Sequence, residues 1–176
     1  FSSCTSLTSI VIPSSVTKIN EYAFAGCTSL TSIVIPSSVT KIDEGAFAGC
    51  TSLTSIVVEE GNSVYDSREG CNAIIETATH KLILGFNSTI IPSSVTAIGR
   101  GAFAHCISLA SIVIPKGITE IGDDAFDGCT SLTSVEIPEG VTEIGEFTFN
   151  DCTSLTSVVI PSSVTKIGKS VFWGCT

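Results

Sequence analysis

The chain has 176 residues, of which 43% are hydrophobic and only 14% are charged. This much apolar material can form a buried core, which excludes a disordered chain. The formal net charge of −9 argues against nucleic acid or an anionic membrane as a partner, because both are bound by clustered Lys and Arg.

The N-terminal segment 1–27 contains three predicted elements. Ser9–Ile12 is β-branched and alternating, which predicts a short strand, and Pro13 ends it because proline cannot donate to a ladder. Val16–Ile19 is expected to form a second short strand or extended corner. Glu21–Cys27 is too short for more than a turn or two of α or 3₁₀ helix.

This unit recurs along the chain with a 23-residue period. The repeat is marked by one column of cysteines, evenly spaced within each of two blocks: Cys4, Cys27 and Cys50, then Cys106, Cys129, Cys152 and Cys175. A period in the twenties is typical of a solenoid. The columns expected to face the core are, in the first coil, Leu7, Ile10, Ile12, Val16, Ile19, Ala23, Phe24 and Cys27. One coil cannot bury these side chains alone, so we expect the strands of successive coils to stack in parallel.

One region departs from the repeat. We expect one solenoid domain over 1–176, with regular coils at 1–58 and 86–176 and an irregular insertion at about 59–85. Within the insertion, two apolar runs at 73–75 and 82–84 flank a polar link at 76–81, a pattern that predicts an inserted β-hairpin. Tyr65 and Phe86 are predicted at its base, with the link as its most mobile part.

The repeated sequence L-T-S-I-V-I-P-S-S-V-T-K-I, followed by A-F-A-G-C, resembles the BspA-like leucine-rich repeat of the Treponema pallidum type. The insertion at 65–75 is similar to the irregular coil of members from gut bacteria. The resemblance implies a leucine-rich-repeat solenoid from a bacterial surface protein, of a gut anaerobe. Because the members with a described role are adhesins or host-interaction factors, it also implies an extracellular or cell-surface location.

The eight cysteines would suggest a disulfide framework in a secreted chain. Seven of them, however, lie in one column, where stacked coils hold the Cβ atoms parallel rather than convergent. We therefore predict a ladder of buried free thiols that pack as small hydrophobic side chains. The 23-residue spacing also lacks the short paired ligands of a zinc site, so no structural metal is predicted.

Few residues suggest chemistry. Cys71 and His80 are the one pair that could act as nucleophile and base, but no orienting partner accompanies them. The acidic residues Asp66, Glu69, Asp123, Asp124 and Asp127 could bind calcium, yet their spacing does not match an EF-hand loop, and a solvated acidic face is the favoured interpretation. We predict no catalytic residue, no metal site and no cofactor.

Candidate partner-binding residues lie in outward columns. The strand position that points away from the core is almost always apolar, and reads Val11, Val34, Val57, Ile90, Val113, Glu136 and Val159. Strand propensity alone would favour valine there, and the alternative is an apolar stripe that marks a contact surface. In a second column the side-chain charge changes from positive at Lys18 and Lys41 to negative at Glu120 and Glu143, and back to positive at Lys166. His80 lies in the hairpin link. These residues complete the predicted contact set.

The predicted function is therefore a non-enzymatic adhesion or interaction module that binds a protein or glycan, on host matrix or on other cells. The alternative is a spacer that presents another domain. No run approaches the roughly 20 apolar residues of a membrane span, so no membrane insertion is expected in this segment. The chain starts at Phe1 without Met, and we expect a fragment of a longer protein that carries the signal and anchor elsewhere.

Overall fold

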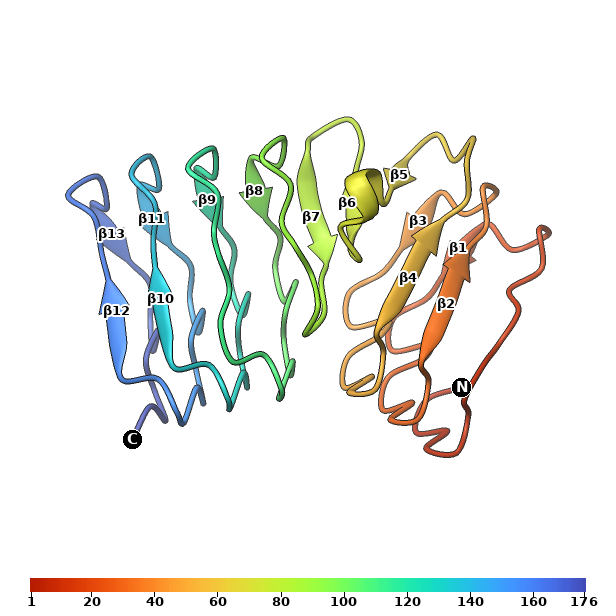
Figure 1. Cartoon of the computed structure of the whole chain (residues 1–176), viewed down its shortest axis with the longest axis horizontal. Coiled ribbons are helices and arrows are strands. Elements are labelled where there is room, and N and C mark those ends of the chain that lie inside the picture. The colour runs from red at the N-terminus through yellow and green to blue at the C-terminus, as the bar shows by residue number, and fades with distance from the viewer.

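The computed structural model describes residues 1–176, which form a curved solenoid with the two termini at opposite ends (Figure 1). Paired strands of the regular coils are offset by one 23-residue period, as in Lys18 with Lys41 and Ser134 with Ser157. The predicted solenoid and its period are therefore confirmed. The structure contains no helix with the length and apolar character of a bilayer span.

The first strand column is made of two separate parallel pairs. One joins β2 (Ser32–Ile35) to β4 (Ser55–Val58) and the other joins β10 (Ser134–Glu136) to β12 (Ser157–Val159). In β2 and β4 exposed and buried residues alternate, as expected for strands with one face on the core. The predicted strand at 9–12 is wrong: Thr31 bonds to the carbonyl of the preceding residue, Thr8 (3.3 Å), but no strand forms at 9–12.

The second strand column also divides into two sheets. A two-stranded sheet holds β1 (Lys18–Ile19) and β3 (Lys41–Ile42). A seven-stranded sheet follows, in the order β13 (Lys166–Ile167), β11 (Glu143–Ile144), β9 (Glu120–Ile121), β8 (Ala97–Ile98), β7 (Lys81–Leu84), β6 (Ile74–Glu76) and β5 (Tyr65–Asp66). The solenoid ladder thus stops and restarts near the insertion, on both strand columns.

The third side of each coil is a run of tight turns, where short helices were expected. In the first coils, Tyr22 (φ 54°) and Gly26 (φ 70°) adopt left-handed backbone conformations, which interrupt any helix. Only one 3₁₀ helix is present, η1 (Arg68–Gly70), in the irregular segment. Turns of neighbouring coils are hydrogen bonded to each other, as where the Phe24 amide donates to the Ala46 carbonyl (2.8 Å). We call this series of bonds the turn ladder.

Stacked phenylalanine rings follow the turn ladder, and all except the terminal rings of Phe1 and Phe172 are buried in the core. Rings 1, 24 and 47 stack with centroids 5.4 and 5.3 Å apart, and rings 103, 126, 149 and 172 stack at 5.1, 5.4 and 5.7 Å. Between the two stacks, Gly85 takes the place of the phenylalanine, because its amide donates to Ala102 as that of Phe24 does to Ala46. A Cβ on Gly85 would lie 2.2 Å from the Phe103 ring, so the position can carry a side chain only if that ring moves.

The predicted hairpin forms and is built into the sheet. β6 and β7 pair antiparallel, while β7 also pairs in parallel with β8 of the next regular coil. Ile74 packs in a core of 16 buried residues with the N-terminal coils, and Ile75 packs in a core of 25 with the C-terminal coils. Tyr65 and Phe86, which were predicted at the base of the hairpin, are buried in the N-terminal core. The segment therefore joins two separately packed halves.

Side chains close the strand edges that face this junction. The Ile56 amide of β4 donates to Asn72 Oδ1 (2.8 Å) and the Val58 amide donates to Ser67 Oγ (3.0 Å). At the second column, the Ile42 amide of β3 donates to the Tyr65 hydroxyl (3.1 Å). These bonds satisfy partly buried donors where no neighbouring strand supplies a carbonyl, so the ladder can stop without leaving an open edge.

The columnar cysteines are mostly buried, and all eight thiols are free. From Cys27 onward, each thiol of the regular column donates to a backbone carbonyl of the preceding coil, for example Cys129 to Phe103 (3.2 Å). Burial raises the pKa of Cys50 to about 11 and that of Cys106 to about 12. A protonated thiol is a poor nucleophile and metal ligand, which fits a packing role.

Candidate interaction surfaces

The outward valine column is exposed along the whole solenoid. Val11 and Val113 keep 89% and 84% of their surface accessible, and Val159 keeps 56%. Val34 and Val57 are neighbours in the β2–β4 register and are each 48% exposed. The column is interrupted by Glu136, which lies beside Val159 in the β10–β12 register. The structure thus places the predicted apolar stripe on the surface, and the two strand pairs that carry part of it lie toward opposite ends of the rod (Figure 1).

The charged column lies in different sheets from the valines, and its charges are paired. Glu120 accepts a hydrogen bond from Lys81 (2.8 Å) and Glu143 forms an ion pair with Lys166. At the other end of the rod, Asp43 lies between the Lys18 and Lys41 ammonium groups, at 2.8 and 3.2 Å. The hydrogen bond from Lys18 and the second from Lys41 hold the pKa of Asp43 below its usual value. The charges of this column are therefore largely balanced by oppositely charged neighbours.

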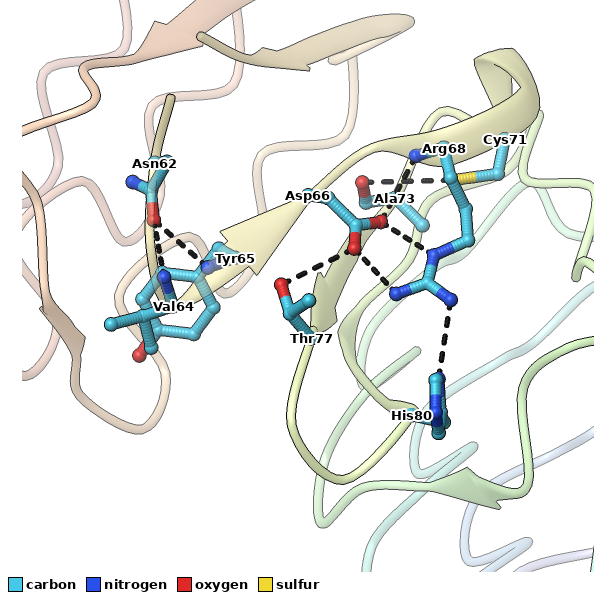
Figure 2. Close-up of polar contacts among 9 residues, drawn as sticks. All are labelled: Asn62, Val64, Tyr65, Asp66, Arg68, Cys71, Ala73, Thr77 and His80. Carbon is cyan, nitrogen blue, oxygen red and sulfur yellow. Dashed lines mark hydrogen bonds and ion pairs between the residues drawn. The ribbon is translucent and has the colours of Figure 1, made fainter. Parts of the chain in front are cut away.

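His80 and Cys71 do not meet. The His80 ring lies against the Arg68 guanidinium, with Nη1 and Nδ1 3.2 Å apart, whereas the Cys71 thiol points to the Ala73 carbonyl (3.8 Å), as Figure 2 shows. Burial raises the pKa of Cys71. This is the opposite of what a nucleophilic thiol needs.

The polar group around Arg68 is structural. Arg68 donates to both carboxylate oxygens of Asp66, and the Asp66 carboxylate also accepts from the Arg68 amide and from Thr77 (Figure 2). Partial burial opposes ionisation, but the hydrogen bonds from Arg68 hold the pKa of Asp66 below its usual value. Asn62 orders the backbone just before this group, because its Oδ1 accepts hydrogen bonds from the Val64 and Tyr65 amides. These bonds order the irregular coil.

The aspartates considered for calcium have separate partners. Asp124 pairs with Arg100, Asp127 lies near His105 and Asn150, and Asp123 accepts from the Glu146 amide. No group of three or more His, Cys, Asp or Glu side chains is placed to hold a metal ion.

A cleft that we did not predict from the sequence lies on the turn side of the solenoid, between the two halves. This junction cleft has a volume of about 530 Å³, within the size range of binding pockets. One wall is the turn at 42–51 of the N-terminal half, and the other is the turn at 99–106 with 81–87 between them. The cleft exists because the irregular segment does not form a complete turn here: Gly85 stands at the phenylalanine position, and no regular turn fills the space between the two walls.

Arg100 crosses the mouth of the junction cleft. Its guanidinium lies 3.2 Å from Glu44 on one wall and 3.1 Å from Asp124 on the other. The charge of Glu44, followed by the hydrogen bond that Arg100 donates to Asp124, raises the pKa of Arg100. Asp43 and Asp127 also line the cleft, as do Lys81 and His105. The four lining carboxylates outnumber the Lys81 and Arg100 cations.

One signal in the sequence does point to this cleft. The phenylalanine that marks each regular turn is absent from 51–85, where Gly85 stands in its place. A missing turn in a stacked solenoid leaves its neighbours uncovered on that side. The cleft was not predicted because the hairpin pattern accounts for the strands of the insertion but not for the turns on the third side of the coil.

Comparison with known proteins gives one family and several related structures. A model of the BspA type leucine rich repeat region matches residues 1–72 and 73–176. A leucine rich cell surface protein from Faecalibacterium prausnitzii is 35% identical with a TM-score of 0.72, and it aligns with 100% of this chain and 53% of its own. The chain therefore spans about half the length of that protein.

Two other structures are also similar. A leucine-rich repeat protein from Eubacterium ventriosum is 25% identical (TM-score 0.74), over 99% of this chain and 59% of its own. The Treponema pallidum leucine rich repeat protein is 30% identical (TM-score 0.60), over 96% of this chain and 76% of its own. No curated protein matches the sequence.

Proposed function

Because the chain belongs to the BspA-type leucine-rich repeat family, a family of repeat proteins that act in protein interaction or as scaffolds, we propose that it is a non-enzymatic adhesion module displayed on the cell surface. Its partner is a protein or glycan of host matrix or of another cell. The description of the Faecalibacterium prausnitzii relative as a cell surface protein supports the location.

The observation that carries the proposal is the exposed valine column. A side chain such as Val113, with 84% of its surface in water, contributes nothing to the core, and a row of such residues is the kind of apolar surface that partners bury. The strand ladder holds Val34 and Val57 in fixed register, so a partner would meet a preorganised surface and lose little conformational freedom on binding. Glu136 and the two acidic residues Glu120 and Glu143 would tune orientation toward a charged partner.

The test is adhesion of the purified chain to immobilised mucin, fibronectin and collagen, measured by surface plasmon resonance. The variant Val34→Asp/Val57→Asp places two charges on the column and should weaken binding about tenfold or more, since charge at the core of an interface is strongly disfavoured. Ser14→Asp/Ser94→Asp adds the same two charges at exposed turn positions and should bind like the unchanged protein.

The spacer alternative gives a different result. If both charge variants adhere equally well in the context of the whole cell-surface protein, while deletion of one 23-residue coil changes adhesion, the chain sets a distance rather than contacting the partner. Absence of binding to every surface tested would contradict the adhesion proposal itself.

A further inference from the structure

We propose that the junction cleft is a second binding site, which takes an extended peptide segment with an arginine side chain as an added rung of the turn ladder. This inference does not depend on the valine column, which lies in the first strand column and not in the cleft.

The first argument is the backbone of the cleft walls. In the preceding coil, the amides of Phe24 and Gly26 donate to the carbonyls of Ala46 and Ala48, both at 2.8 Å. The equivalent amides of Phe47 and Gly49, on the N-terminal wall, have no acceptor in the chain. This wall is therefore the open donor edge of an interrupted ladder.

The opposite wall carries the matching acceptor. The Ala48 carbonyl accepts from Gly26, and the Asp127 carbonyl accepts from His105 at 2.7 Å, but the equivalent carbonyl of Ala104 accepts no hydrogen bond. Each edge of an extended peptide carries both carbonyls and amides, supplied by alternate residues. The carbonyls on one edge can therefore accept from Phe47 and Gly49 while an amide on the other edge donates to Ala104. This is the principle by which peptides add to open sheet edges.

The shape of the walls allows a backbone to approach. Five glycines line the cleft, namely Gly45, Gly49, Gly85, Gly99 and Gly101. At Gly45, Gly85 and Gly99 a Cβ would meet Tyr22, Phe103 and Leu82 of the chain itself. The absent side chains also leave these walls low, so that another main chain can come close. Apolar atoms of Phe47, Ile83 and Leu84 complete the lining and would cover alternate side chains of the incoming segment.

The charge of the mouth selects the side chain. Glu44 and Asp124 already hold one guanidinium, that of Arg100, at 3.2 and 3.1 Å. Arg100 is an exposed residue whose surface ion pairs contribute little, so an arginine of the peptide can take its place between the same carboxylates. An acidic peptide would meet Asp43, Glu44, Asp124 and Asp127 together and be repelled.

The experiment measures fluorescence anisotropy of labelled, acetylated hexapeptides of alternating Thr and Arg. We expect saturable binding of the Thr-Arg peptide and none of the matched Thr-Glu peptide. A Thr-Arg peptide with alternate backbone amides N-methylated should bind at least about tenfold more weakly, because it cannot donate to the Ala104 carbonyl. Binding of the Thr-Glu or the N-methylated peptide with equal affinity would overturn the proposal, as would no binding of any peptide.

Three variants locate the site. Glu44→Gln/Asp124→Asn should weaken binding about tenfold, and Arg100→Ala should strengthen it up to about fivefold by freeing the two carboxylates. Ala104→Tyr should abolish binding by filling the cleft. The matched control Glu139→Gln, at an exposed carboxylate outside the cleft, should bind like the unchanged chain. Equal affinity of all four proteins would overturn the assignment.

Hydrogen exchange gives an independent readout. With the Thr-Arg peptide bound, the Phe47 and Gly49 amides should exchange more slowly, whereas unchanged rates at both would contradict insertion into the ladder. Val34→Asp/Val57→Asp should still bind the peptide, and Ala104→Tyr should still bind the surface partner. Failure of one site is thereby separated from failure of the other.

Discussion

Replacement of Phe126 by Ala tests the stacked-coil architecture most directly. Phe126 is fully buried and lies between the rings of Phe103 and Phe149, at 5.1 and 5.4 Å. Its removal forfeits up to roughly 3 kcal/mol of apolar transfer energy and two ring contacts of roughly 0.5–1.5 kcal/mol each. With the cavity that remains, the expected loss is about 4–5 kcal/mol of unfolding free energy.

Phe172 provides the matched comparison within the same stack. It is 36% exposed and meets only one ring, that of Phe149 at 5.7 Å. Phe172→Ala should therefore cost about 2 kcal/mol, because roughly two-thirds of the transfer energy and one ring contact are lost while water can fill the space. Urea denaturation followed by circular dichroism measures both, as a shift of the midpoint at constant slope. Equal losses at the two positions would refute the nearest-neighbour account of stability.

Three further experiments have distinct expected results. The columnar thiols should resist alkylation until the chain unfolds, and fast labelling of the folded chain would contradict their burial. Burial raises the pKa of thiols such as Cys50 to about 11, so the unfolding free energy should be constant below about pH 8.5, the unfolded thiol pKa, and fall as pH rises toward 11. A flat profile over that range would contradict this. The amide of Ile74, which is fully buried, should exchange slowly, and the turn at 77–80, between the paired ends of the link at Glu76 and Lys81, should exchange quickly. Equal rates would mean two solenoids with a disordered linker instead of one domain. Gly85→Ala should cost about 1–3 kcal/mol, because the new Cβ would meet Phe103, and adding Phe103→Leu should recover part of that loss in a double-mutant cycle.

The fold could be predicted because the repeat carries its own internal comparison. Leu30 and Ile33 belong to columns that are apolar in nearly every coil, so packing explains these columns without any homologue, and both residues are buried in the structure. The outward position of Val34 followed from the same alternation. Periodicity of this kind is a local property, since each coil contacts only its neighbours.

The turns were the least accurate part of the sequence prediction. Composition at 21–27 allows a short helix, but the structure places Tyr22 in the left-handed region, a conformation that no propensity predicts for a bulky residue. Its cause lies in the adjacent coil, whose turn must pair with this one through the Phe24 amide. The local backbone is thus set by a contact with the following coil.

The period, the buried columns, the cysteine ladder and the pairing of the inserted hairpin can all be read from the amino-acid sequence, because they follow from patterns within one or two coils. The joining of β7 to β8, and the end of the first strand column at Asn72 and Ser67, emerged only when the chain was folded. Folding also placed Glu44 and Arg100, which are distant in the chain, across one cleft at 3.2 Å. These outcomes depend on how an irregular segment packs between two regular stacks, and no repeat in the sequence specifies that packing.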